Sequence, residues 1–517
     1  MRRIILLVTV VLLIPQVAWA SSFAAGPTVR VSGASPFVAH PDCGLAGQTG
    51  TNYRDSEVEP WVDVNPANSK NLIGAWQQDR WSNGASRGNV VGTSSDGGQT
   101  WTTVSQTKNS LCTGGTAANG GGYERATDPW VTISPNGVAY LMSLSVDQDP
   151  NSFFGSNPDA MLVSKSTNGG LTWSAPTTLI RDTNPNRFND KNSMTADPND
   201  SKYVYAIWDR LVSPPSGTPN PIAGENALAY RGPTLFARTT NGGASWERAR
   251  IIYDPGTLNQ TIGNQIVVLP DNRRFDGELV NVFDLIYGAS NAHKNRGLNA
   301  ALIRSEDHGQ TWSPEPVVFA KMLPRQVTDP DDGDRLRTAD IIPEVAVDPN
   351  SGQLYAVWED SRFGGGAYDS IALSTSKDGG LTWSKPVKVN KTPGNIRVGN
   401  RQAFVPSVDV ASDGTVSVTY YDFRKNTADP DKLPTNYWMV HCHPSSTGGC
   451  SDAGDYGDET RLTDTSFDME KAPVSEGRGY FLGDYEGLAN VGDEFAPFFS
   501  QTKGGDPASV YFRRVGP

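Results

Sequence analysis

The sequence predicts an all-β protein assembled from one repeated unit of four strands. Octads with the pattern Ser/Thr-x-Asp/Asn-x-Gly-x-Thr/Ser-Trp occur at 94–101, 166–173, 239–246, 305–312 and 376–383. They start about 66 to 73 residues apart, and a pattern with a constant period indicates one structural unit repeated along the chain. The chain also has 53 glycines, 36 prolines and only short apolar stretches, as is typical of many short strands joined by turns.

Each octad is expected to be a turn between two strands rather than a binding site. An Asp or Asn side chain accepts hydrogen bonds from nearby backbone N–H groups and closes a tight turn, and glycine allows backbone angles that side chains resist. The Trp then begins the next strand and buries its ring between neighbouring units. The alternative is that Asp96, Asp307 and Asp378 bind a metal or a substrate, but recurrence in every unit favours a scaffold.

The spacing also predicts the number of units. About 497 residues follow residue 20, and at about 71 residues per unit they make seven units; six units with an elaborated C-terminal segment are the alternative. First strands are expected at 61–64, 130–133, 193–196, 265–269, 344–347, 407–410 and 486–490. Second strands are expected at 72–77, 139–145, 204–208, 280–286, 354–358, 416–421 and 495–501. Residues 28–32 can supply the outer strand of the last unit.

The N-terminus has the features of a cleaved export signal. Arg2 and Arg3 precede an apolar run at 4–14, and Ala18-Trp19-Ala20 supplies small residues for cleavage after residue 20. The apolar run is too short to span a membrane comfortably. We therefore expect a secreted or periplasmic protein with a signal peptide at 1–20 and a single domain at 21–517, without membrane insertion.

The remaining cysteines are Cys43, Cys112, Cys442 and Cys450. An even number in an exported chain predicts two disulfides, with three pairings to choose from. We favour Cys442–Cys450, which closes a short loop, and Cys43–Cys112, which brackets the first unit. The net charge of −12 argues against nucleic acid and anionic membrane surfaces as partners.

The octads are similar to the Asp-box, or bacterial neuraminidase repeat, so the chain resembles the sialidase-like superfamily of β-propellers. This resemblance covers most of the chain after residue 20 and implies a propeller of four-stranded antiparallel blades. It also implies a sialidase-like glycoside hydrolase acting on terminal sialic acid or another acidic sugar. Because many proteins with this box are not sialidases, the alternative is a non-catalytic glycan-binding or protein-interaction propeller. Sialidases proper have six blades, which differs from the seven expected here.

Charged residues are expected to gather at one mouth of the central channel. Strands alternate in direction, so the starts of first strands and the ends of second strands share a face, and the octads lie on the opposite face. Arginines stand just before the first strands: Arg54, Arg125, Arg187, Arg337, Arg401 and Arg478. Others follow the second strands beside Asp residues: Arg80, Arg210, Arg362 and Arg424. They either form salt bridges repeated in each unit or hold an anionic ligand, which suits the planar fork of Arg.

Carboxylates are interleaved with these arginines near the starts of the first strands. They are Glu57, Glu59, Asp128, Asp340, Glu344, Asp484 and Glu486. Together with the arginines they make one mouth of the channel the expected ligand site.

The resemblance also implies roles for particular residues. Sialidases hold the sugar carboxylate with three arginines, and use a Tyr nucleophile assisted by a Glu and an Asp as acid/base. The corresponding candidates are Arg54, Arg337 and Arg401 for the clamp, Tyr421 (or Tyr480) as nucleophile, Glu359 (or Glu344) as its partner, and Asp79 as acid/base. The family's Phe/Tyr-Arg-Ile-Pro signature is absent, because the chain reads Asn52-Tyr53-Arg54-Asp55. For Tyr421, packing within a strand is the favoured alternative.

No cofactor is required by this scheme. The acidic loop 329–334, Asp-Pro-Asp-Asp-Gly-Asp, offers the clustered oxygen ligands that Ca²⁺ prefers. It lacks EF-hand spacing, so a solvated loop is favoured over a Ca²⁺ site. The expected partner is a carbohydrate ligand or glycoconjugate, and the protein is expected to be a monomer.

Overall fold

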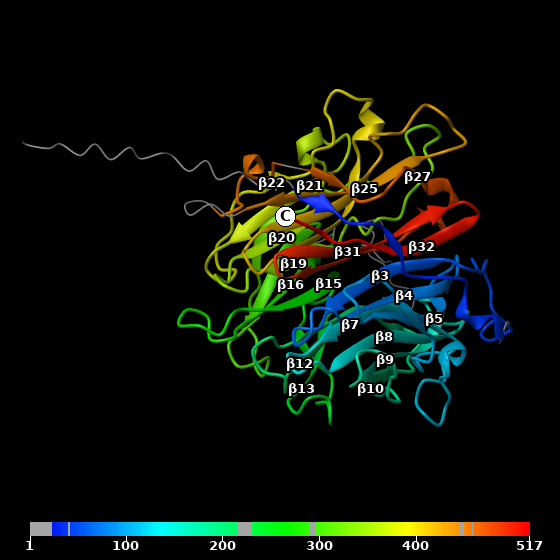
Figure 1. Ribbon diagram of the computed structural model, residues 1–517. Coiled ribbons are helices and arrows are strands. Elements are labelled where there is room, and N and C mark those ends of the chain that lie inside the picture. The colour runs from blue at the N-terminus through cyan, green and yellow to red at the C-terminus, as the bar shows by residue number, and fades with distance from the viewer. Residues whose placement is uncertain (1–22, 40–41, 215–229, 289–294, 444–448, 458) are drawn as a thin grey trace, which may run out of the picture.

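The computed structural model describes residues 23–39, 42–214, 230–288, 295–443, 449–457 and 459–517 (Figure 1). The expected export signal at 1–20 lies outside these residues. The described chain is built from antiparallel strands, and its helices are short 3₁₀ segments such as η4 (Val398–Arg401) and η6 (Met469–Lys471). The predicted all-β class is therefore confirmed.

The strands form successive four-stranded meanders. The first two share one eight-stranded sheet because Ser86 pairs with Ala126. They comprise β3 (Glu57–Val64), β4 (Leu72–Arg80), β5 (Ser86–Ser94) and β6 (Thr102–Val104), then β7 (Arg125–Ile133), β8 (Ala139–Gln148), β9 (Ser156–Ser166) and β10 (Thr177–Asp182).

The next meanders are separate sheets. They comprise β11 (Arg187–Ala196), β12 (Val204–Val212), β13 (Thr234–Thr239) and β14 (Arg250–Tyr253); β15 (Asn259–Val268), β16 (Leu279–Tyr287), β17 (Asn299–Ser305) and β18 (Val317–Lys321); β19 (Glu344–Val347), β20 (Leu354–Asp360), β21 (Ser370–Ser376) and β22 (Val387–Lys388); and β23 (Ala403–Val410), β24 (Val416–Asp422), β25 (Pro434–Cys442) and β26 (Glu459–Arg461). A short strand β27 (Phe467–Asp468) also pairs with β25.

The last sheet joins the two ends of the chain. It contains β30 (Gly487–Val491), β31 (Glu494–Lys503), β32 (Asp506–Phe512) and β33 (Val515–Gly516), and the N-terminal strands β1 (Ala24–Ala25) and β2 (Val29–Arg30). β2 pairs with β32 through Val29↔Phe512 and Arg30↔Tyr511. The predicted use of residues 28–32 as an outer strand of the last unit is therefore confirmed.

The sheets close into a ring. Strands β3, β7, β11, β15, β19, β23 and β30 contact one another in turn, and β30 returns to contact β3. Figure 1 shows the same closure, with the red strands β31 and β32 beside the blue strands β3 and β4. This is the arrangement of a β-propeller, in which closing the ring leaves only short sheet edges.

Every octad forms the predicted turn, and it joins the third and fourth strands of its meander. In the first, Ser94 Oγ donates to Asp96 Oδ1 at 2.8 Å, and the Thr100 backbone N–H donates to the same oxygen at 2.9 Å. The equivalent bonds recur in the other four octads. The Trp rings pack against the preceding unit, as Trp101 does on Phe512 at 5.3 Å between centroids. The octads are therefore structural turns.

Both favoured disulfides are present, Cys43–Cys112 and Cys442–Cys450. Such bonds persist in oxidising compartments. None of the helices among the described residues is long and apolar enough to cross a membrane.

Candidate functional site

Irregular first strands bring charged side chains toward one mouth of the ring. Three of these strands, β3, β7 and β11, start four to six residues earlier than expected. In each, the pairing with the next strand shifts register within this additional N-terminal stretch. At these shifts Glu59, Asp128 and Lys191 have φ angles of 52°, 48° and 49°. Positive φ is uncommon for residues with side chains and is typical of functional sites.

These three side chains meet in what we call the charged cluster: Glu59, Asp128, Lys191, Arg337 and Asp484. Lys191 Nζ lies 3.6 Å from Glu59 Oε1 and 3.6 Å from Asp128 Oδ1, and it also pairs with Asp484. Arg337 Nε donates to Asp484 Oδ1 at 2.9 Å. One lysine and one arginine thus share three largely buried carboxylates that come from different strands and loops.

The cluster separates the proton affinities of its carboxyl groups. Burial raises the pKa of Glu59 to about 7, against the opposing charge of Lys191. Burial also opposes ionisation of Asp484, but Arg337 and Lys191 outweigh it and hold the pKa of Asp484 well below its ordinary value. Nearby, burial raises the pKa of Asp340 to about 6 despite Arg478. Carboxyl groups with such different pKa values in one place are typical of acid/base sites.

A small cavity of about 10 Å³ lies beside the cluster. Its walls include Arg337, Thr338, Val405, Tyr421 and Tyr480, and it has room for about one water molecule. The structure therefore brings three sequence-predicted residues, Arg337, Tyr421 and Tyr480, to one cavity.

Tyr421 is fully buried, and its hydroxyl has a carboxyl partner. It donates to Glu486 Oε1 at 3.0 Å and to the Ser500 carbonyl at 2.6 Å. The hydrogen-bond partner of Tyr421 is thus Glu486, whereas Glu359 and Glu344 were the candidates from the sequence. Burial raises the pKa values of both Tyr421 and Glu486 well above their ordinary values.

Glu359 supports the wall of the same cavity. Its carboxylate accepts hydrogen bonds from Thr338 Oγ1 at 3.1 Å and from the Val405 backbone N–H at 2.9 Å. Burial and the neighbouring Asp369 raise its pKa well above its ordinary value. Glu344 lines a second cavity of about 30 Å³, together with Trp130, Lys191 and Tyr485.

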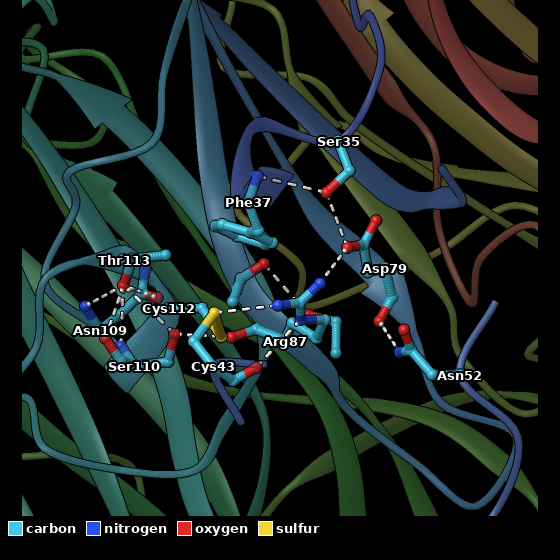
Figure 2. The surroundings of a disulfide bond; sticks show 12 residues. Ser35, Phe37, Cys43, Asn52, Asp79, Arg87, Asn109, Ser110, Cys112 and Thr113 are labelled. Atoms are coloured by element: carbon cyan, nitrogen blue, oxygen red, sulfur yellow. Dashed lines mark hydrogen bonds and ion pairs between the residues drawn. A yellow bond between two sulfur atoms is a disulfide. The ribbon is translucent and has the colours of Figure 1, made fainter. Parts of the chain in front are cut away.

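Asp79 lies apart from these cavity walls, next to a disulfide (Figure 2). It is fully buried at the end of β4, where it pairs with Arg87 at 3.1 Å and accepts from Ser35 Oγ at 2.7 Å. Arg87 in turn donates to the Cys43 carbonyl at 3.2 Å. In this arrangement Asp79 fixes the loop that carries the Cys43–Cys112 bond.

The other two predicted arginines do not join Arg337. Arg54 is exposed in a turn before β3. Arg401, in η4, donates from Nε to the Ile396 carbonyl at 2.8 Å and lies over the Tyr368 ring. Among the described residues, no hydrogen bond or ion pair links either of them to the charged cluster.

Three of the arginines that were expected after second strands form ion pairs with nearby carboxylates. Arg362 pairs with Asp360 at 2.7 Å and Arg424 with Asp422 at 2.5 Å, each two residues away. Arg210 pairs at 2.8 Å with Asp182 of the preceding sheet. These pairs support the interpretation that the arginines form salt bridges within the protein rather than hold an anionic ligand.

Sequence reasoning missed Lys191 as a member of the site. Its position in the repeat could have identified it. Directly before the first three expected first strands stand the equivalent pairs Glu59-Pro60, Asp128-Pro129 and Lys191-Asn192. In an alignment of the units, Lys191 takes the position that carboxylates hold in three other units and apolar residues or glycine in the rest; the equivalent residues are Glu59, Asp128, Asp484, Gly263, Ile342 and Val405.

No group of three or more His, Cys, Asp or Glu side chains among the described residues stands ready to coordinate a metal.

No protein-family model matches the sequence, and a comparison with curated proteins gives no match. Among solved structures, the chain is similar to a Hadza microbial sialidase at 15% identity and a TM-score of 0.45, with 76% of this chain and 66% of that chain covered. The chain thus spans slightly less than two thirds of the length of that sialidase. It is similar to the intramolecular trans-sialidase from Ruminococcus gnavus at 13% identity and a TM-score of 0.41, with 89% of this chain and 94% of that chain covered. It is also similar to an α-L-arabinanase from Penicillium chrysogenum at 14% identity and a TM-score of 0.42, with 95% of this chain and 98% of that chain covered.

Proposed function

We propose that the protein is an exported, sialidase-like glycoside hydrolase that acts on a terminal acidic sugar. The observation that carries the proposal is the hydrogen bond from Tyr421 to Glu486 at a cavity that Arg337 also lines. A Tyr–Glu pair beside an arginine is the combination that the sequence resemblance implies for the hydrolysis of an anionic sugar. The two disulfides support export, and we propose a monomer that needs no cofactor.

We further propose that residues 21–517 form a single propeller of seven blades. The closed ring of first-strand contacts supports this number, since each of β3, β7, β11, β15, β19, β23 and β30 begins one meander. The pairing of β2 with β32 completes the last blade with a strand from the other end of the chain.

The proposed reaction uses a neutral nucleophile. Tyr421 Oη attacks the anomeric carbon and passes its proton to Glu486, while the leaving-group oxygen takes a proton from Asp340. A water molecule then attacks the anomeric carbon and gives one of its protons to Asp340, while the bond from the sugar to Tyr421 breaks and Glu486 returns its proton to Tyr421 Oη. A neutral tyrosine suits an anionic sugar because a carboxylate nucleophile would be repelled, and sialidases depart from the two-carboxylate scheme in this way. The pKa of about 6 fits Asp340 to donate a proton near neutral pH.

Arg337 and Arg478 are the proposed partners of the sugar carboxylate. Arg337 holds Asp484 through two of its nitrogens, and among the described residues the third, Nη1, has only a 3.4 Å contact with Ser475 Oγ. Arg478 is exposed, and the positive charge of Arg337, followed by burial, lowers its pKa. Two guanidinium groups held near each other in this way attract a carboxylate.

Substrate entry requires the cavity to widen. The hairpin formed by β28 (Val474–Ser475) and β29 (Gly479–Tyr480) covers this side, and the Arg337 backbone N–H donates to the Tyr480 carbonyl at 2.9 Å. We propose that an outward shift of this hairpin opens the cavity to a sugar ring.

A second candidate is a non-catalytic propeller that binds glycans or proteins. It is favoured by the small size of the cavity and by the arginines that are already paired within the chain, Arg210, Arg362 and Arg424. Such a protein would bind its ligand on the outer rim without turnover.

The test is product release from a panel of fluorogenic glycosides, with α-sialosides and uronides beside neutral sugars. The wild-type protein is expected to turn over an acidic glycoside, and Arg337→Gln is expected to raise KM about tenfold or more, because a charged hydrogen bond to the sugar is lost. Arg362→Gln is the matched control and should leave KM unchanged. Folded protein that turns over no acidic glycoside would favour the binding propeller.

A further inference from the structure

The second cavity, of about 30 Å³, lies inside the ring, and we call it the channel chamber. Its walls come from the first strands β7, β11, β15 and β19, which meet around the channel, and from the chain just before β30. The chamber has room for about two water molecules. The reacting groups of the proposed hydrolase do not line it, so any ligand here occupies a separate site.

One buried polar atom of the chamber wall lacks a hydrogen bond. Asn192 is only 2% exposed, and its Nδ2 donates to the Asp128 carbonyl at 2.9 Å. Its Oδ1 is buried and has no partner in the described structure. Buried side-chain oxygens in native proteins are nearly always satisfied by the protein, by water or by a ligand. Because Asn192 lines the chamber, a molecule inside it can supply the missing donor.

A second amide of the wall has a hydrogen-bond donor to spare. Gln265 lines the chamber and is half-buried. Its Oε1 accepts from the Val345 backbone N–H at 3.0 Å, whereas its Nε2 donates to no other group in the described part of the chain. The wall thus offers one acceptor and one donor. A hydroxyl group both donates and accepts, so hydroxyl groups suit this pair.

The walls of the chamber carry no unbalanced charge. The ammonium group of Lys191 is shared by Glu59, Asp128 and Asp484. Burial raises the pKa of Glu344 to about 8, so this carboxyl group is mostly neutral at pH 7. A charged ligand would therefore find no counter-ion here, and the chamber favours a neutral molecule.

Aromatic rings give the chamber a rigid apolar wall. Trp130 stacks on Trp61 with 3.5 Å between ring centroids, and Tyr485 meets Trp130 edge-on at 5.5 Å. Trp130 and Tyr485 both line the chamber, as does the aliphatic Ile342. Pockets that combine apolar walls with a few polar groups are typical of small-molecule sites. Carbon atoms of a ligand can pack on this wall while its hydroxyl groups reach the two amides.

We propose that the channel chamber binds a neutral vicinal diol. One hydroxyl donates to Asn192 Oδ1, the other accepts from Gln265 Nε2, and the carbon atoms between them pack against Trp130. Two adjacent hydroxyl groups take the places of the two water molecules for which the chamber has room. The diol belongs either to a free polyol or to the edge of a neutral sugar, since both present the same chemical group.

The test is saturation-transfer NMR of the full-length protein with ethylene glycol, the smallest vicinal diol, as the probe. We expect a saturable signal with a Kd of about 10⁻³–10⁻¹ M, because so small a ligand gains little binding free energy. Dimethoxyethane, which has no donor for Asn192, should not displace the probe. Displacement by dimethoxyethane, or no saturable signal up to about 0.5 M, several times the weakest expected Kd, would overturn the proposal.

Competition identifies the source of the diol. Displacement of ethylene glycol by glycerol alone would support a site for free polyols. Displacement by methyl β-galactoside as well would support a site for the edge of a neutral sugar. If neither compound displaces the probe, the proposal is wrong. These outcomes do not depend on the proposed hydrolase activity, because binding is measured without turnover.

Variants locate the binding in the chamber. Asn192→Leu should weaken binding at least about tenfold, because the unpaired acceptor is lost. Ile342→Phe removes no side-chain hydrogen bond but fills the chamber, and it should weaken binding as strongly, so it decides the matter where Asn192→Leu does not fold. The matched controls are Asn395→Leu and Ile251→Phe, which change exposed residues elsewhere and should bind the probe as the wild type does. Unchanged affinity of folded Ile342→Phe would rule out the chamber as the site.

Discussion

Lys191 is the residue on which the charged cluster depends. Its ammonium group is the shared counter-ion of Glu59, Asp128 and Asp484, and its side chain is only 10% exposed. We expect Lys191→Met to lower the free energy of unfolding by about 3–5 kcal/mol, because removing one partner of a buried ion pair leaves uncompensated charge. Urea denaturation measures this change.

The matched control for Lys191 is Lys202. It pairs with Asp200 at 3.6 Å, but its side chain is 72% exposed. Lys202→Met should change the free energy of unfolding by less than about 0.5 kcal/mol, because exposed ion pairs contribute little. Equal effects of the two substitutions would contradict the assigned role of Lys191.

Among the elements, the octad turns are the parts whose structure was most predictable. Their Asp or Asn, Gly and Trp residues are a local signal, and the hydrogen bonds that form the turn stay within five residues. The bulges in the first strands were not predictable in this way. Glu59, Asp128 and Lys191 adopt positive φ without being glycine, and only the packing of neighbouring strands around the channel determines that conformation.

Gly98 in the first octad tests how closely the turns pack. Its φ is +91°, and a Cβ there would lie 2.0 Å from Phe512 Cε1 of the last sheet. Gly98→Ala should destabilise the fold by about 2–4 kcal/mol, through overpacking and an unfavourable φ. Gly504→Ala, at φ +64° with no atom within 4 Å, should cost only about 1–2 kcal/mol. Similar midpoints for both variants in urea would argue against this contact.

For the whole molecule, buried carboxyl groups set the dependence of stability on pH. Burial raises the pKa of Glu57 to about 8, of Glu344 to about 8 and of Asp63 to about 7. A raised pKa means that the folded state binds more protons than the unfolded state between about pH 4 and 8. Stability should therefore fall as pH rises from 5 to 8, and the thermal midpoint should drop by several degrees.

Substitution of these groups checks the cause of that drop. Glu57→Gln combined with Glu344→Gln should make the thermal midpoint less dependent on pH between 5 and 8, since neither side chain then titrates. A wild-type midpoint that is higher at pH 8 than at pH 5 would show that the buried carboxyl groups do not dominate.

The sequence predicted the molecule's architecture better than its site. Octad spacing, short strands and the N-terminal outer strand all follow from local patterns. The site depends on residues that meet only through ring closure, such as Tyr421 of β24 and Glu486, which lies just before β30. Glu486 was visible as a charged residue near a first strand, but nothing in one sequence connects it to Tyr421. For Asp79 the sequence predicted a role that its contacts do not support. Its position at the end of a second strand fitted an acid/base residue, but its side chain contacts Arg87 and Ser35 instead.

The most direct measurement is the turnover of a fluorogenic α-sialoside by the wild-type protein beside Tyr421→Phe and Tyr437→Phe. Both tyrosines are fully buried and lie 4.3 Å apart between ring centroids, but Tyr437 donates to Thr419 Oγ1 rather than to a carboxylate. We predict that the wild type turns over the substrate, that Tyr421→Phe lowers kcat at least a hundredfold while remaining folded, and that Tyr437→Phe retains most activity. Equal activity of the two variants, or no turnover by folded wild-type protein, would contradict the central claim.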